Sequence, residues 1–521
     1  MDHYAVIGPP GTGKTTYLKG QVERAASVFG GNEVMVCSLT KAAAAEIKGR
    51  ADSIPEHRIG TLHSFAFRSI GCPELAEGKI GEWNTANPNF ALGPTKRKGN
   101  PEDDDDASAA AIEFDGDEYP GDDLHTQMEL WRHDRRPRDA WRGDVKNFAQ
   151  RWDEWMNDSG YVDFTGFIEG ALETPHAPGM PLAMFVDEAQ DMSRLEISLI
   201  KRWAAECNTL VAVGDGAQAL YTFRGAEPDE FLTAGDAAHL RVLQQSYRVP
   251  RAVHAAATTW AAPLLTGVEY RPRDYAGSVV EEDEVSLKDP DSVAEALIDD
   301  LACHTGTVMF QAQTNRMVAS VVQNLKESGV PFHNPNRLRS GAWNPLGKRK
   351  KGTSTIDRFL AWIDDKQSEK TISLWLPMLK SQGILARGAK KRSLDTVEHV
   401  RDLFASDEAM NAAFSGDLNW LMASVTNEFA DYLSYIVRVY RNYGRSGIVD
   451  TPRLMVGTVH SYKGAEADSV WLAPDLSKPA WDEYDNEDPK PVQRLMYVGM
   501  TRARDALHVL RPKGGWHACV V

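Results

Sequence analysis

One stretch constrains the fold of this chain more than any other feature: Gly8, Pro9, Pro10, Gly11, Thr12, Gly13, Lys14, Thr15 and Thr16. It follows an apolar run at residues 3–7 and precedes a helix-like segment at residues 17–26. Glycines at this spacing let backbone N–H groups converge on phosphate oxygens, and the start of a helix adds partial positive charge. Lys14 would reach the β- and γ-phosphates of a nucleotide, and Thr15 would bind Mg²⁺. The stretch therefore predicts a phosphate-binding loop in an α/β fold.

A second apolar run, residues 182–186, ends in a pair of acids, Asp187 and Glu188. Such a pair can supply one carboxylate for a metal ion and one base for an attacking water. We assign Asp187 to Mg²⁺ and Glu188 to the base. Taken alone, the pair also fits a surface turn after a strand; the phosphate-binding loop upstream favours the catalytic interpretation.

Short apolar runs, each followed by a turn and a helical pattern, recur near both ends of the chain. They predict buried strands of parallel sheets at residues 3–7, 34–38, 182–186, 210–213, 307–311, 454–458 and 469–472. Residues 78–178 and 334–449 lack this strand rhythm and carry helical stretches such as residues 144–157 and 418–443. We therefore expect two α/β cores, each interrupted by a largely helical insertion. The predicted boundaries are residues 1–77 with 179–250, insertion 78–178, residues 251–333 with 450–521, and insertion 334–449.

The formal charge of -16 at first argues against a nucleic-acid partner. The acid is local, however, because residues 99–130 hold 12 Asp or Glu and no Lys or Arg, and removing these from -16 leaves only -4. This acidic stretch predicts a solvated loop, and a sharper hypothesis is that it mimics nucleic-acid charge. Basic groups at residues 132–151 and 348–351 could contact phosphates, although solvated charge is the favoured interpretation.

The composition also indicates a compartment. Hydrophobic residues make up 42% of the chain, yet no apolar stretch reaches the length of about 18 residues that a membrane span needs, and no export signal is evident. The five cysteines are far apart and form no metal-binding spacing. We expect a cytoplasmic protein with no membrane partner.

Further motifs follow the phosphate-binding loop in a fixed order. They occupy residues 38–46, 60–65, 213–226, 245–248, 457–466 and 497–504. In their order and residue pattern, these segments resemble the conserved motifs of superfamily 1 DNA helicases of the UvrD/Rep/PcrA kind. Tyr161-Val-Asp-Phe164 also resembles part of the family's first insertion. The resemblance covers both predicted cores. It implies two RecA-like P-loop cores with parallel sheets, carrying a 1B-like insertion and a reduced 2B-like insertion.

The resemblance implies roles in ATP hydrolysis for residues outside the loop. Arg248 and Arg502 would reach the γ-phosphate from opposite sides of a cleft, and Gln218 would sense that phosphate. Tyr247 resembles the tyrosine that stacks on adenine, and Glu466 the acid that hydrogen-bonds the ribose. Taken alone, each arginine would fit a surface ion pair, and Tyr247 would fit a buried tyrosine packed between strands.

The resemblance also implies a track for single-stranded DNA. Phe223 offers a stacking face, with a core phenylalanine as the alternative. The remaining DNA-binding candidates supply hydroxyls and imidazoles that can bond phosphates without reading bases: Thr40, Thr61, His63, Ser64, Thr458, His460 and Ser461.

These features predict an ATP-dependent single-stranded DNA translocase and helicase that moves 3'-to-5' and uses ATP and Mg²⁺. Its expected partners are single-stranded DNA and duplex–single-strand junctions. One alternative is a DNA-dependent ATPase that displaces proteins or remodels recombination intermediates with little unwinding. An alternative of another class is a nucleotide-switched DNA-binding or loading factor, against which intact Glu188, Gln218, Arg248 and Arg502 argue.

Overall fold

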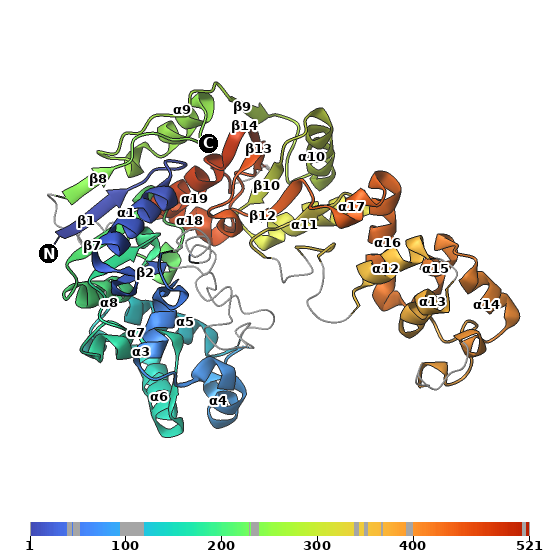
Figure 1. Ribbon diagram of the computed structural model, residues 1–521, viewed down its shortest axis with the longest axis horizontal. Coiled ribbons are helices and arrows are strands. Elements are labelled where there is room, and N and C mark those ends of the chain that lie inside the picture. Colours follow the sequence, from blue (N-terminus) through green and yellow to red (C-terminus); the bar gives the residue numbers. More distant parts are fainter. Residues whose placement is uncertain are drawn as a thin grey trace. The chain divides into compact units, whose positions relative to one another are not determined.

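The chain forms two compact units in a computed structural model, Met1–Gly277 with Asp482–Thr501 and Ser278–Trp481 with Arg502–Val521. Figure 1 labels its helices and strands. The residues that the structure describes are 2–38, 44, 53–93, 119–228, 230, 239–337, 343–347, 353–365, 368–391, 400–512 and 517–519. Of the site candidates, Thr40 lies outside them.

The first unit is built on a sheet of parallel strands in the order β3-β2-β6-β7-β1-β8. Side chains alternate between its two faces, as strand geometry requires. Val34 and Val36 of β2 pack with helix α1 on one face, whereas Met35 and Cys37 pack with α3, α7 and α8 on the other. Both faces are therefore buried, which is typical of parallel sheets. The strands are β1 (Asp2–Ile7), β2 (Val34–Ser38), β3 (Ile59–Thr61), β6 (Ala183–Val186), β7 (Thr209–Gly214) and β8 (Leu240–Val242).

The helices of the first unit surround this sheet and build the first insertion. They are α1 (Lys14–Phe29), α3 (Leu62–Ser69), α4 (Ile80–Ala86), α5 (Asp122–His133), α6 (Gly143–Ser159), α7 (Phe164–Glu173), α8 (Arg194–Ala204), α9 (Arg251–Trp260) and α19 (Lys490–Met500). A short parallel pair joins β4 (Glu74–Leu75), just before the insertion, to β5 (Tyr161–Val162) within it, so the insertion contains a two-residue strand that its sequence rhythm did not indicate.

An aromatic cluster forms the core of the first insertion. Trp83 and Trp152 are fully buried, with ring centroids 4.9 Å apart, and Phe148 packs against both. Beside this cluster, the buried Arg132 donates to Asp163 at 2.6 and 2.9 Å and to Glu169 at 2.7 Å. Burial alone would raise the pKa of Asp163, but Arg132 and the Trp152 N–H lower it to about 2. The expectation of solvated charge is therefore wrong for Arg132, because its charge is matched by buried carboxylates.

The acidic stretch also departs from expectation. Residues 99–118 lie outside the described part, but residues 122–130 belong to α5 and form no loop. Asp122 is buried because its carboxylate accepts the backbone N–H groups of Gly93 and Tyr119, at 2.9 and 3.2 Å. These two backbone donors offset the cost of removing the Asp122 carboxylate from water, which the acidic composition of the stretch did not indicate.

The second unit repeats the parallel architecture, with strand order β11-β12-β10-β13-β14-β9. Its strands are β9 (Ser278–Glu282), β10 (Val308–Ala312), β11 (Phe332–His333), β12 (Leu454–Thr458), β13 (Ala467–Leu472) and β14 (Ala503–Leu510). Its helices are α10 (Pro290–Cys303), α11 (Asn315–Glu327), α12 (Thr355–Asp364), α13 (Glu369–Trp375), α14 (Asp407–Phe414), α15 (Leu418–Ser424), α16 (Asn427–Tyr443) and α17 (Ser446–Val449). Helix α18 (Lys478–Asn486) crosses the sequence boundary between the units.

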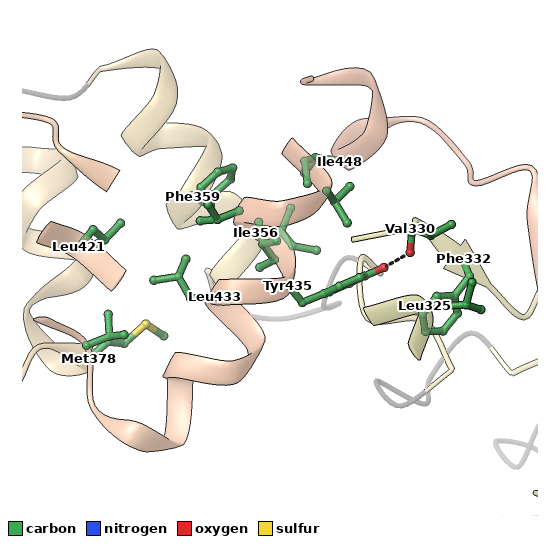
Figure 2. Packing of buried hydrophobic residues seen from close by; sticks show 14 of the residues in the cluster. Leu325, Val330, Phe332, Ile356, Phe359, Met378, Leu421, Leu433, Tyr435 and Ile448 are labelled. Atoms are coloured by element: carbon green, nitrogen blue, oxygen red, sulfur yellow. Dashed lines mark hydrogen bonds between the residues drawn. The ribbon is translucent and has the colours of Figure 1, made fainter. Parts of the chain in front are cut away.

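The second insertion shares one apolar cluster with the sheet of its unit. Figure 2 shows Tyr435 of α16 reaching toward Val330, whose carbonyl accepts the tyrosine O–H at 2.9 Å. The predicted helix at residues 418–443 is in fact two helices, because the chain is extended at Val425 and Thr426 between α15 and α16. None of the described helices is long and apolar enough to cross a membrane.

Every strand predicted from an apolar run is present within two residues of its expected bounds. The two parallel sheets confirm the predicted α/β class and are consistent with two RecA-like cores. The four-part boundaries remain a prediction; within the two compact units, residues 251–277 and α19 group with the first.

Candidate nucleotide and nucleic-acid sites

The phosphate-binding loop leaves β1 and enters α1, as its sequence predicts. Gly11 and Gly13 adopt left-handed backbone conformations, φ 70° and 78°, which glycine tolerates best. A Cβ at Gly8 would lie 2.1 Å from Cγ of Lys14, so only glycine lets the lysine fold across the loop. Lys14 donates to the Gly8 carbonyl at 2.7 Å, which holds its ammonium over the loop. A loop of this shape fits the phosphates of a nucleotide.

Residues 246–248 close against the loop from the side. The Ser246 hydroxyl donates to the Pro10 carbonyl at 2.8 Å, and the Tyr247 N–H donates to the Gly11 carbonyl at 2.8 Å. A Cβ at Gly11 would lie 2.5 Å from Cβ of Arg248, so this arginine sits directly beside the loop. The Tyr247 side chain is 72% exposed, which excludes a tyrosine packed between strands and leaves its ring open for stacking.

The two acids follow β6, at the same edge of the sheet as the loop. The carboxylate of Asp187 is buried and accepts the Glu188 N–H at 3.0 Å. Glu188 has φ 53°, a left-handed conformation that costs a non-glycine residue energy and is typical of functional sites. Mg²⁺ usually takes one or two protein oxygens and completes its shell with water and phosphate. Asp187 and the Thr15 hydroxyl, at the start of α1, are a donor set of that kind.

A buried amide connects the predicted base with the loop after β7. Gln190, fully buried in the 3₁₀ turn Ala189–Asp191, donates to Glu188 at 2.5 Å and to Asp191 at 3.1 Å. Its oxygen accepts the Asp215 N–H at 3.0 Å, and the Asp215 carboxylate accepts the Gln218 amide at 2.6 Å. Burial raises the pKa of Asp215 above its ordinary value, and Lys14 and the Gln218 amide oppose this rise only in part. Glu188 and Gln218 therefore belong to one hydrogen-bonded network.

The network reaches two further segments of the first unit. Asp191 accepts the Leu220 N–H at 3.1 Å, shortly before Phe223. Phe223 is 48% exposed, so it is no core residue, and the stacking of a base on its ring stays a prediction. On the other side, Arg494 of α19 donates to the Gly216 carbonyl at 3.0 Å.

Arg502 and Glu466 belong to the second unit. The Arg502 side chain is buried and donates to the Ala465 carbonyl at 3.3 Å. Glu466 pairs with Arg504 at 3.2 Å. Their proposed contacts with a nucleotide therefore stay predictions.

Two turns of the same sequence pattern carry most of the predicted DNA-binding residues. In the first turn, residues 60–64, the Ser64 N–H donates to the Thr61 hydroxyl at 3.2 Å and the Ser64 hydroxyl donates to the Thr61 carbonyl at 2.8 Å. In the second turn, residues 457–461, Ser461 bonds Thr458 in the same way, at 3.3 and 2.7 Å. In both turns the serine proton is engaged internally, which makes the threonine hydroxyl the better phosphate donor.

The first turn is fixed by buried charge. His63 is buried, its Nδ1 lies 3.8 Å from the Glu196 carboxylate, and its ring meets Phe164 edge-on. Burial raises the pKa of Glu196, but His63, His133 and the Ser193 N–H lower it overall. His133, at the end of α5, lies 2.9 Å from the Ser193 hydroxyl, and burial lowers its pKa. His63 is thus built into a buried polar cluster and is a weaker candidate for a direct phosphate contact.

The second turn is fixed by neutral amides. Asn334, fully buried after β11, donates to the Ser461 hydroxyl at 3.0 Å, and Asn336 donates to the Ser461 carbonyl at 2.7 Å. His460 is partly exposed in this turn. A Cβ at Gly457 would lie 2.4 Å from the Asn334 amide, so this glycine makes room for the asparagine.

Sequence reasoning missed several residues of these sites. Gln190 stood inside the motif that contributed Asp187 and Glu188, and a polar residue two places after the pair was an available signal. Glu196, Asn334 and Arg494 had no such signal, because their partners are distant in sequence.

Comparison with known proteins places two family models on the chain. A model described as an AAA domain matches residues 2–224, and a model described as a UvrD-like helicase C-terminal domain matches residues 352–512. DNA helicase II of Haemophilus influenzae is 24% identical over 282 residues, which cover 48% of this chain and only 37% of that relative. The Bacillus subtilis protein named "Putative ATP-dependent DNA helicase YjcD" is 20% identical over 604 residues, covering 97% of this chain and 76% of that relative.

Proposed function

Because the chain belongs to the UvrD-like superfamily 1 helicases, we propose that it is an ATP-driven translocase on single-stranded DNA that also unwinds duplexes, moving 3'-to-5'. The observation that carries the proposal is the network from Glu188 through Gln190 to Asp215 and Gln218. Through Asp191 and Leu220, this network connects the residues that we assign to hydrolysis with the loop that bears Phe223. A motor needs such a connection, because its chemistry must respond to its track.

In this proposal, ATP binds with its phosphates on the loop at residues 8–16 and its base against the exposed ring of Tyr247. Thr15 and Asp187 would hold Mg²⁺, which neutralises phosphate charge when bound. Glu188 takes the proton from the water that attacks the γ-phosphorus, while the Gln190 amide fixes the orientation of the carboxylate. Arg248, against the loop, stabilises charge on the transferred phosphoryl group, and we assign Arg502 the same role from the second unit.

DNA lies on the Phe223 ring and on the hydroxyls of Thr61 and Thr458. These contacts address base faces and phosphates, so they tolerate any sequence and suit a protein that moves along a strand. The preferred substrates are single strands and duplex–single-strand junctions.

The proposal is tested by ATP hydrolysis measured without DNA, with single strands and with forked duplexes, beside duplex unwinding and streptavidin displacement. We expect single strands to stimulate hydrolysis and forks with a 3' tail to be unwound. Strong displacement with little unwinding would instead favour a protein-displacing ATPase. ATP binding without DNA-stimulated turnover would contradict the motor and favour a nucleotide-switched loading factor.

A further inference from the structure

We propose that Arg337 and Trp343, in the segment that follows β11, form an additional binding site for single-stranded nucleic acid beside the second turn. The proposal rests on the proposed function, because the second turn is one of its two DNA contacts.

The described residues on either side of the site, 334–337 and 343–347, are hydrogen-bonded to each other. The Asn334 N–H donates to the Asn344 side chain at 3.0 Å, and the Asn344 amide donates to the Arg337 carbonyl at 2.7 Å. The Arg337 N–H donates to the Asn334 carbonyl at 3.2 Å. Strand β11, which precedes these residues, is itself anchored to helix α16. Tyr435 of α16 donates to the Val330 carbonyl and packs against Phe332 (Figure 2). Arg337 therefore begins from an ordered backbone, which lowers the entropy that binding must cost.

Two asparagines tie this segment directly to the second turn. Asn334 and Asn336 both donate to Ser461, one to its hydroxyl and one to its carbonyl. Arg337 is the next residue along the chain, and its charge also acts on the buried Tyr462, just after the turn. Burial raises the pKa of Tyr462 well above its ordinary value, and the charge of Arg337 opposes this rise only in part. A strand whose phosphate meets Thr458 would therefore pass close to Arg337.

The side chains offered at this position suit a single strand. The Arg337 guanidinium lies over the Trp343 ring, 5.3 Å from its centroid, and both side chains are partly exposed. Within the described residues, no carboxylate lies at ion-pair distance from Arg337. A guanidinium over an indole keeps N–H groups for a phosphate oxygen, and the part of the Trp343 ring that is not packed against the apolar cluster can contact a base. The pair binds without reading sequence, as the two turns do.

The test is equilibrium binding of a fluorescent oligothymidylate to the full chain over a range of salt concentrations, without nucleotide. Arg337→Ala should weaken binding about tenfold and flatten the dependence of log K on log salt by about 0.7, the value for one phosphate contact on a single strand. Arg337→Lys keeps the charge but loses the guanidinium over the Trp343 ring, so it should keep the salt dependence and lose part of the affinity. Trp343→Leu should weaken binding and keep the salt dependence.

Arg387→Ala is the matched control, because Arg387 is an exposed arginine of the same unit. It should change neither affinity nor salt dependence. If Arg337→Ala binds like the wild type with an unchanged salt slope, the additional site does not exist. If Arg337→Ala is unstable, Arg337→Lys and Trp343→Leu decide: wild-type affinity in both variants would overturn the site, and a flattened salt dependence in Arg337→Lys would overturn the assignment of a charge contact. Failure of the wild type itself to bind the oligonucleotide would instead refute the proposed function.

Discussion

The two Gly-Thr-x-His-Ser turns have the same internal hydrogen bonds but different supports. The first turn is backed by ionisable groups, Glu196 with His63 and His133. The second is backed by uncharged amides of Asn334 and Asn336. Five residues thus specify the turn itself, whereas the surroundings decide how rigid it is and how it responds to conditions.

Sheet order explains why the supports differ. The first turn follows β3, which is the outermost strand of its sheet, so its support comes from helices α5 and α8. The second turn follows β12, which has β11 on its outer side, and the chain leaving β11 supplies the asparagines. Because β11 lies beside β12, neutral asparagines support the second turn, whereas the first turn, after an edge strand, is supported by charged groups of helices.

The units also differ in chemistry. Among the described residues, the phosphate-binding loop and the acids after β6 belong to the first unit, while each unit has one turn. Changing the base should therefore stop hydrolysis without touching either turn. We expect Glu188→Gln to lose roughly 10²- to 10⁴-fold in turnover while MgATP and DNA affinities stay near normal, because the water loses its base and the binding groups remain. Single-turnover hydrolysis measures the change, with the exposed Glu173→Gln as control; near-normal turnover would reject Glu188 as the base.

The glycine before the threonine has less free space around it in the second turn than in the first. A Cβ at Gly457 meets the Asn334 amide at 2.4 Å and the Ser461 hydroxyl at 2.5 Å, whereas a Cβ at Gly60 meets the Ser64 hydroxyl at 2.8 Å. Gly457→Ala should destabilise its unit by about 1–3 kcal/mol, with Gly60→Ala at or below the lower end of that range. Thermal unfolding of the two variants measures the difference. Equal losses would mean that the asparagines move aside freely.

Acid should loosen the first turn before the second. Because burial lowers the pKa of His133, the unfolded chain takes up a proton near pH 6.5 that the folded chain resists, so stability falls as the pH drops below that value. The lowered pKa of Glu196 adds a loss of the same sign only below its ordinary value of 4.5. Between pH 7.5 and 5.5 we expect hydrogen exchange, corrected for intrinsic rates, to rise a few-fold more at residues 60–66 than at residues 457–463.

His133→Gln should remove most of that pH dependence, and the exposed His176→Gln should not. Equal acceleration at both turns would assign the acid sensitivity to other groups, such as His333, whose pKa burial also lowers.

Local chemistry explains what the sequence predicted correctly. The loop at Gly8 to Thr16 and the acids after β6 are written in consecutive residues, and strands such as β12 are continuous apolar runs. Edge strands were harder: β9 is largely exposed and β11 has two residues, so neither forms an apolar run.

The supports of the sites could not be predicted, because they join distant positions. Asn334 and Ser461 are 127 residues apart, and His133 and Ser193 are 60 apart. Arg132 looked solvated because its partner Asp163 is 31 residues away and no local pattern connects them. Only the folded chain shows which charge is matched and which remains available.

The central claim is that the threonine of each turn contacts DNA, while the phosphate-binding loop and the acids after β6 belong to the first unit. It is tested most directly by ATP hydrolysis titrated with single-stranded DNA for the wild type, Thr61→Val and Thr458→Val. Each substitution removes one phosphate donor, together with the hydroxyl that accepts the serine N–H of its turn. The lost phosphate bond, worth about 0.5–1.5 kcal/mol, should raise the half-saturating DNA concentration by about 2- to 12-fold. Turnover at saturating DNA and turnover without DNA should both stay within about twofold of the wild type, since no hydrolytic group changes. An unchanged half-saturating concentration in Thr458→Val, or loss of DNA-free hydrolysis in either variant, would contradict the account.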